Sequence, residues 1–94
     1  MTKSDLIEEL AARANLTHVE ADKIVNEIFD SMADTLVAGN RIEIRGFGSF
    51  VVKEYAGYTG RNPKTGLDVT VNPKKLPFFK VGKDLKERIL DSGK

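Results

Sequence analysis

Seven consecutive residues, Gly-Arg-Asn-Pro-Lys-Thr-Gly, place two cations around a proline and have a glycine at each end. Pro63 has a fixed φ and no N–H, and Gly60 and Gly66 can supply positive φ, so we predict a tight hairpin tip. The tip carries Arg61 and Lys64 beside a rigid apolar ring, which suits a stacked, anionic target such as a nucleic-acid groove. The same residue types also form ordinary solvated turns, so the heptapeptide alone leaves both interpretations open.

Residue types that perform catalysis or hold metals are scarce. The 94 residues include no cysteine, and the one histidine, His18, follows a predicted N-cap and is expected to be an exposed helix-start residue. No Ser/His/Asp or Cys/His arrangement and no thiolate metal site can be built from this composition. Gly46-Phe47-Gly48 lacks the third glycine of a dinucleotide fingerprint and is interpreted as a turn. We expect no enzyme, metal, cofactor or small-molecule substrate.

The net charge of +1 hides an uneven distribution along the chain. Residues 1–40 hold three bases against eight acids, a net charge of −5, whereas residues 41–94 hold twelve bases against six acids, a net charge of +6. This asymmetry is typical of a polyanion-binding face on a supporting body. The first residues contain no continuous apolar run of the kind found in signal peptides or membrane spans, so we expect a soluble, cytoplasmic protein without a membrane partner.

The elements that position the tip begin with two predicted helices. Thr2 and Thr17 are each followed three residues later by an acid, the arrangement of a capping box. Apolar residues then recur at helical spacing: Leu6, Ile7, Leu10 and Ala14 in the first segment, and Ala21, Ile24, Val25, Ile28, Phe29, Met32 and Leu36 in the second. The first helix is expected to end near Asn15 and the second at Gly39, which predicts an antiparallel helical hairpin.

At Arg41 the hydrophobic period changes from 3.6 to 2, where strands are predicted to begin. We expect strands at 41–45, 49–55, 67–71 and 76–80 and a short helix at 84–90. The segment 53–62 is one side of a two-stranded ribbon about 33 Å long, at about 3.3 Å per residue. Such a ribbon has little core to rest on and should project. The short helix is expected to turn Leu85 and Ile89 inward.

These elements predict an α+β fold with a two-helix N-terminal hairpin, a three-stranded antiparallel sheet, a long protruding β-ribbon arm and a short C-terminal helix. We expect a single domain over 1–94, composed of a helical dimerisation body at 1–40, a sheet at 41–82 with the arm at about 53–75, and a helix and tail at 83–94. The chain carries more apolar surface than one short layer can bury. We therefore expect an obligate dimer, whose shared core includes Phe29, Phe47, Phe50 and Phe79.

The segments Gly46–Phe50, Thr59–Gly66 and Pro77–Lys86 follow the helical hairpin in that order. Together they resemble the HU and integration host factor family of bacterial DNA-bending proteins, over essentially the whole chain. Met1–Glu8 and Arg41–Arg45 are most similar to the β subunit of integration host factor. The resemblance implies an intertwined dimer whose helices form the body and whose two arms wrap the minor groove of double-stranded DNA.

The resemblance also implies roles for the tip and for the basic residues around it. Pro63 is similar to the proline that intercalates at each arm tip, unstacks a base step and kinks the duplex. Minor-groove contacts are implied for Tyr58, Thr59, Arg61, Asn62 and Lys64. Phosphate contacts are implied for Lys3, Arg45, Gly46, Gly48, Ser49, Lys53, Lys74, Lys75, Lys80, Lys83 and Lys86. The implied function is architectural DNA bending and nucleoid organisation in a bacterium.

The base of the arm departs from the family pattern. It reads Tyr55-Ala56-Gly57-Tyr58, where relatives often carry arginines. Tyrosines pack on sugars or donate hydrogen bonds to phosphates, but they release no counterions. We therefore expect the arm base to contribute less electrostatic affinity than an arginine-rich one.

Other interpretations remain open at this point. We favour a homodimer with weak sequence preference, and the alternative is a subunit of a sequence-preferring heterodimer with a paralogous partner, acting in recombination, replication and transcription. Arg45–Val51 imitates the aromatic strand motif of an RNA-binding module, but Ser49 stands where an aromatic residue is needed, and that fold begins with a strand. A purely structural oligomerisation module would leave Arg61 and Pro63 without a purpose.

Overall fold

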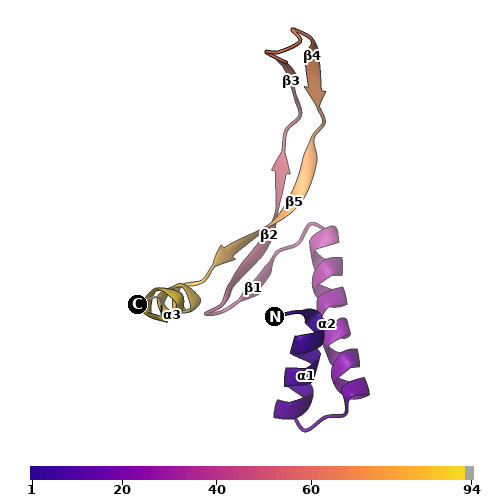
Figure 1. Ribbon diagram of the computed structural model, residues 1–94, viewed down its shortest axis with the longest axis vertical. Helices are drawn as coiled ribbons and strands as arrows, with labels where there is room; N and C mark the ends of the chain where they lie inside the picture. Colours follow the sequence, from indigo (N-terminus) through magenta and orange to yellow (C-terminus); the bar gives the residue numbers. More distant parts are fainter. Residues whose placement is uncertain (93–94) are drawn as a thin grey trace.

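The chain builds a helical hairpin, a sheet from which a long arm projects, and a third helix beyond the other end of the sheet (Figure 1). The computed structural model describes residues 1–92, so the last two residues of the expected 83–94 segment lie outside the described residues. The helices are α1 (Lys3–Arg13), α2 (His18–Val37) and α3 (Lys83–Ser92). The strands are β1 (Ile42–Ile44), β2 (Gly48–Tyr55), β3 (Tyr58–Arg61), β4 (Asp68–Val71) and β5 (Lys74–Val81). The molecule is elongated, with extents of 61 × 36 × 26 Å.

Capping boxes begin both helices of the hairpin, as predicted. The Thr2 N–H donates to the Asp5 carboxylate at 2.9 Å, and the Asp5 N–H donates to the Thr2 hydroxyl at 3.2 Å. Thr17 and Glu20 repeat this exchange at 2.9 and 3.1 Å. The Thr17 backbone N–H, and then its side chain, hold the pKa of Glu20 below the ordinary value of 4.5. This cap therefore contributes stability at neutral pH that is lost as the pH falls through the lowered pKa.

The two helices of the hairpin share a small core. α1 ends at Arg13 and Asn15 takes a left-handed φ of 53°, which asparagine tolerates better than most residues. α1 and α2 then run side by side (Figure 1) and bury Ile7, Ala21 and Val25, which are 4%, 0% and 2% exposed. Within residues 1–92, no helix is long and apolar enough to cross a membrane.

A second apolar face of α2 has no cover within residues 1–92. Ile24, Ile28 and Phe29 are 41%, 51% and 44% exposed. The stripe predicted on this helix is therefore divided, because one part packs against α1 and the other faces outward. Burying one such side chain contributes about 1.5–3 kcal/mol, so covering this face with a second chain adds substantially to a core of three residues. This is the surface that the expected dimer covers.

β2 is the central strand of a three-stranded antiparallel sheet with the order β1-β2-β5. β3 and β4 form a separate two-stranded antiparallel ribbon. The β2–β5 ladder ends where Tyr55 lies opposite Lys74, and the β3–β4 ladder begins where Tyr58 lies opposite Val71. The α+β class and the projecting arm are confirmed. The arm expected as one continuous ribbon is divided into two hydrogen-bonded parts.

Gly57 and Pro73 explain the division of the arm. Pro73 has no N–H and cannot donate to a ladder between the two strands. Gly57 packs against it so closely that a Cβ at this position would lie 2.6 Å from the Val71 carbonyl oxygen and 2.8 Å from the Pro73 Cδ. The strand predicted from residue 76 accordingly starts at Lys74, directly after the proline.

Of the two glycines of the tip, Gly66 takes a positive φ and Gly60 does not, so the positive φ considered for Gly60 is not used. Gly66 has a φ of 73°. Gly60 lies within β3 opposite Val69, where the ladder keeps it in extended backbone. The tight part of the tip therefore begins after Arg61, which is the last residue of β3.

The inward packing expected for α3 is absent from the part of the chain that the structure describes. Ile89 is 58% exposed and Leu85 is half-buried. The first turn of α3 attaches it to the sheet, because the Leu85 N–H donates to the Gly46 carbonyl at 3.0 Å. The rest of the helix extends away from the sheet (Figure 1), so its apolar residues need a surface from another chain.

We expect Gly48→Ala to lower the free energy of unfolding by about 1–3 kcal/mol, the usual cost of overpacking. Gly48 is buried, and a Cβ there would lie 2.6 Å from the Lys80 carbonyl oxygen and from the Phe79 ring. Gly60→Ala is the matched control, because its nearest neighbouring atom would be 3.8 Å away. Urea unfolding followed by circular dichroism measures both, and equal midpoints for the two variants would contradict the prediction.

Candidate nucleic-acid interface

The distal end of the arm presents Pro63 in a loop that Asn62 closes. The Asn62 N–H donates to the Leu67 carbonyl at 2.8 Å, and the Gly66 N–H donates to the Asn62 carbonyl at 2.7 Å. Pro63 and Lys64 are exposed at the end farthest from the helical hairpin (Figure 1). The tip therefore has the geometry of a small wedge with a cation next to it.

The β3–β4 ribbon carries the remaining arm residues that were predicted to face the minor groove. Tyr58, Thr59 and Arg61 are all exposed. Because side chains alternate along a strand, Thr59 and Arg61 share one face of the ribbon, and Tyr58 lies on the other. Arg61 lies opposite Asp68 in the ladder, so an acid accompanies this cation.

The base of the arm is more basic in the structure than its two tyrosines suggested. Tyr55 lies opposite Lys74, whose Nζ is 5.9 Å from the centre of the tyrosine ring. The Lys53 Nζ lies 3.6 Å from the centre of the Phe78 ring, a cation–π contact. Lysines on the two strands thus supply positive charge at the position where the sequence departs from the family pattern.

Lys75 is the one lysine of the arm base that is paired with an acid in the described residues. Its Nζ lies 3.4 Å from the Glu54 carboxylate, and the two residues are direct cross-strand neighbours. Both side chains are mostly exposed, so the pair adds little to stability. Its main effect is electrostatic, because it offsets one of the charges predicted to contact phosphate.

Glu54→Gln is therefore expected to raise the affinity for duplex DNA about two- to fivefold, the range of a surface ion pair worth up to about 1 kcal/mol. The change removes a negative charge from the arm and releases Lys75 for phosphate. Fluorescence anisotropy at fixed salt measures the effect. Glu8→Gln removes the same charge from exposed α1 and serves as the control. An unchanged affinity for the Glu54 variant would show that Lys75 makes no contact.

A second group of predicted contacts meets where the β1–β2 turn holds the start of α3. The Gly82 N–H donates to the Phe47 carbonyl at 2.8 Å, and the Leu85 N–H donates to the Gly46 carbonyl at 3.0 Å. These bonds place Lys83 and the turn side by side. The helix start and Lys83 favour binding of an anion, whereas Asp84 in the same first turn places a carboxylate near Gly46.

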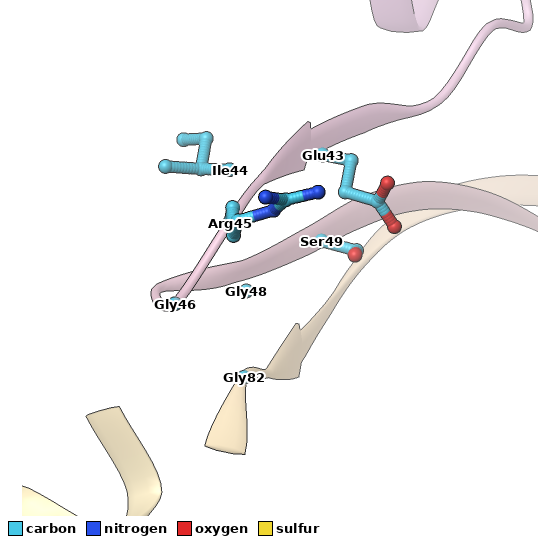
Figure 2. A pocket seen from close by; sticks show the side chains of 7 residues that line it. All are labelled: Glu43, Ile44, Arg45, Gly46, Gly48, Ser49 and Gly82. Atoms are coloured by element: carbon cyan, nitrogen blue, oxygen red, sulfur yellow. The ribbon is translucent and has the colours of Figure 1, made fainter. Parts of the chain in front are cut away.

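The turn and the neighbouring strands enclose an open hollow of about 270 Å³, which we call the turn hollow (Figure 2). It is lined by Glu43, Ile44, Arg45, Gly46, Gly48, Ser49 and Gly82. Figure 2 shows Arg45 pointing toward the side chains of Glu43 and Ser49, and Ile44 pointing away from them. Lys80 lies opposite Ser49 in the sheet and so belongs to the same end of the sheet. Four residues predicted to contact phosphate, Arg45, Gly46, Gly48 and Ser49, thus line one hollow.

Two charged residues of this region were missed at the sequence level. Arg41 donates from Nη2 to the Glu43 carboxylate at 3.2 Å and also contacts the Ser49 hydroxyl at 3.5 Å. The period-2 pattern at residues 41–45 already placed Arg41, Glu43 and Arg45 on one face. Glu43 therefore adds a negative charge to the turn hollow that the list of basic residues did not include.

Other predicted site residues lie apart from the turn hollow or have a packing role. Lys3 is at the start of α1, beside a separate hollow that Phe29 also lines. Gly48 is buried against the Phe79 ring, which gives it a role in packing. The predicted core aromatics of the sheet form one cluster, with ring centres of Phe79 at 5.6 Å from Phe47 and 4.8 Å from Phe50. Phe29 lies outside this cluster, on α2.

A cationic β-ribbon tip on a helical body, with a basic helix start at the same sheet, defines a β-ribbon DNA-binding protein. The family described as bacterial DNA-binding protein matches residues 1–90. Integration host factor subunit beta of Shewanella halifaxensis is 54% identical over 90 residues, which are 95% of each chain. The same subunit of Shewanella pealeana is 53% identical over the same shares.

Solved structures agree with the sequence comparison. A cocrystal structure of Anabaena HU with DNA has a TM-score of 0.82 at 29% identity, covering 95% of this chain and 97% of that one. HU from Thermotoga maritima has a TM-score of 0.67 at 28% identity, covering 95% and 98%. The chain therefore belongs to the bacterial DNA-binding family of HU and integration host factor.

The family assignment confirms the resemblance read from three short motifs, and with it a DNA-binding architectural protein of the bacterial nucleoid. The roles of individual residues stay predictions. Within residues 1–92, no group of three or more histidine, aspartate and glutamate side chains is placed to hold a metal ion.

Proposed function

We propose that this protein bends double-stranded DNA by inserting Pro63 of each arm into the minor groove while basic residues of the body hold the phosphates. The observation that carries this proposal is the position of Pro63. It is exposed in a closed loop at the end of a projecting ribbon, with Arg61 and Lys64 on either side.

Bending the duplex requires both the Pro63 tip and the basic residues that hold the phosphates, because bending costs free energy. Unstacking a base step costs about a few kcal/mol, and bending a short duplex costs about 1–6 kcal/mol. The tip alone cannot offset these costs. Contacts along the arm base, at the turn hollow and at the start of α3 offset them, because each neutralised phosphate releases a counterion.

Gel-shift and end-to-end energy-transfer measurements on a short duplex test the proposal together. We expect binding that brings the two duplex ends closer. A chain that does not bind duplex DNA would reject the DNA interface, and a chain that binds without bending the duplex would reject the wedge.

We propose a homodimer with weak sequence preference, which recognises groove width and step flexibility rather than base edges. The identity of 54% with an integration host factor subunit beta supports the second candidate, a subunit that pairs with a paralogous chain. Purification of this chain alone distinguishes them. A stable dimer that binds random and A-tract duplexes with similar affinity supports the first, and an unfolded or aggregated chain supports the second.

We further propose a division of labour within the single domain. Residues 1–40 serve as the dimerisation body, 41–82 as the sheet with its arm at about 53–75, and 83–94 as the C-terminal helix and tail, in which Lys83 and Lys86 contact phosphate. This division follows the change of net charge from −5 to +6 along the chain. No catalytic activity is part of the proposal.

Lys83→Ala is expected to weaken binding by a similar factor on every duplex, because a phosphate contact carries no sequence information. A dimer loses two such contacts, so the slope of log affinity against log salt should fall by about 1.8, at about 0.9 per contact. Titrations at several salt concentrations measure this slope. Arg88→Ala is the control, since Arg88 is a base of the same helix without an assigned contact. A loss confined to one sequence would contradict the assigned role.

A further inference from the structure

We propose that Asn62 is a positioning residue, which holds the tip loop in the shape that presents Pro63, and does not itself read the DNA. The proposal rests on the function proposed for Pro63. It changes the role of a residue that the family resemblance placed among the minor-groove contacts.

Asn62 takes part in three of the four hydrogen bonds that close the tip. Its N–H donates to the Leu67 carbonyl at 2.8 Å, and its carbonyl accepts from the Gly66 N–H at 2.7 Å. Its side-chain Oδ1 accepts from the Lys64 N–H at 2.9 Å. The fourth bond, from the Leu67 N–H to the Thr65 hydroxyl, is longer at 3.3 Å. Both backbone groups of Asn62 and its side-chain oxygen are therefore directed into the loop.

The burial of the tip residues agrees with this assignment. Asn62 is half-buried, whereas Arg61 and every residue from Pro63 to Gly66 are exposed. The Asn62 side-chain oxygen already accepts from the Lys64 N–H, so one of its two lone pairs is used within the loop. The exposed neighbours are the residues that meet the DNA, and Asn62 lies behind them.

The residue types explain why this position needs an asparagine. Pro63 has no N–H, so the first hydrogen bond inside the loop must come from Lys64. An asparagine side chain accepts from the backbone N–H two residues ahead and so replaces one turn of backbone. The main-chain bond from the Gly66 N–H to the Asn62 carbonyl joins residues four apart, and Gly66 itself takes a positive φ of 73°. A loop closed before binding loses less conformational freedom when Pro63 enters the groove.

The first experiment uses the full chain without DNA. In Asn62→Ala the Lys64 amide should exchange with solvent about three- to tenfold faster, the factor that a hydrogen bond of ordinary strength supplies. Asn62→Asp keeps an acceptor oxygen and should retain the slow exchange. Thr65→Val removes the other side-chain acceptor and should leave the Lys64 amide unchanged. Helical circular dichroism confirms that each variant is folded.

The second experiment measures binding and bending of a short duplex. In Asn62→Ala the bend should decrease, because the wedge is no longer held in place. The variant keeps every cation, so its salt slope should fall no further than the slope of Pro63→Ala, which loses the same body contacts by straightening the duplex. Asn62→Asp should bend DNA as the parent does but bind more weakly at low salt, because of its added negative charge.

Two outcomes overturn the proposal. Unchanged Lys64 exchange in Asn62→Ala shows that the side chain does not hold the loop, and lost affinity with an ordered loop shows that Asn62 contacts DNA. If the parent protein binds without bending, the function proposed for Pro63 fails, and the exchange experiment still decides the role of Asn62.

Discussion

Ile28→Asp is expected to convert the folded protein into an unfolded chain rather than into a folded monomer. Ile28 lies in the middle of the uncovered apolar face of α2, and the core within one chain contains three buried residues. Placing a carboxylate without a partner in a dimer interface costs about 3–5 kcal/mol, and a homodimer incurs this cost twice. Small domains have about 5–15 kcal/mol of stability in total, so most of it would be lost.

Sedimentation and circular dichroism at micromolar concentration measure this result. Val19→Asp is the matched control, because Val19 is exposed on a different side of α2, near the helix start, where an acid is favourable. The control should remain a folded dimer that binds DNA. A folded Ile28→Asp monomer would show that the single chain is stable on its own, which contradicts the shared core.

The sequence predicted best the features that depend on neighbouring residues. Both capping boxes involve residues three apart, and the structure has all four of their hydrogen bonds. The period-2 pattern at residues 41–45 correctly predicted strand β1 and the exposure of Glu43, although Ile44 is also 41% exposed. α1 ends at Arg13, close to the end expected near Asn15, and Asn15 takes a positive φ that asparagine accepts more readily than most residues.

Features that depend on residues distant in the chain were not visible in the pattern. The break in the arm requires Gly57 to meet Pro73, which are 16 positions apart. The alternation of apolar and polar residues gives no sign that Gly57 and Pro73 together interrupt the two strands. The packing of α3 fails for a different reason, since Leu85 and Ile89 have an apolar spacing that says nothing about which chain covers them.

In the candidate site too, the features set by neighbouring residues were predicted, and those set by contacts between strands were not. The tip was recognised from seven consecutive residues. The turn and the basic start of α3 were likewise recognised from short continuous segments of the sequence. Glu43 was missed because a search for positive charge counted bases and not the acids that oppose them, and Arg41 was missed because its contacts with Glu43 and Ser49 appear only in the structure. Within residues 1–92, the structure pairs two bases of this region with acids, Arg41 with Glu43 and Lys75 with Glu54. The affinity for DNA therefore depends on the uncompensated bases, not on the total number.

Pro63→Ala is expected to remove most of the DNA bend while changing the affinity by only a few-fold. Alanine has no ring to hold a base step open, so the cost of unstacking, about a few kcal/mol, is no longer incurred. The bound duplex then stays straighter and gives up some body contacts, and these two changes partly cancel in the binding free energy. The loop itself should persist, because its hydrogen bonds involve Asn62 and Gly66 and none comes from Pro63.

End-to-end energy transfer on a duplex of fixed length separates the bend from the affinity. Lys64→Gln is the control with the opposite expectation. It removes a charge that attracts phosphate and leaves the Pro63 ring intact. It should therefore lower the affinity and the salt slope while the bend is kept. If Pro63→Ala instead weakens binding severely and the remaining complexes are fully bent, the proline contributes to affinity rather than to the kink. The bend would then have to arise from phosphate neutralisation along the body, and the arm would serve as a clamp.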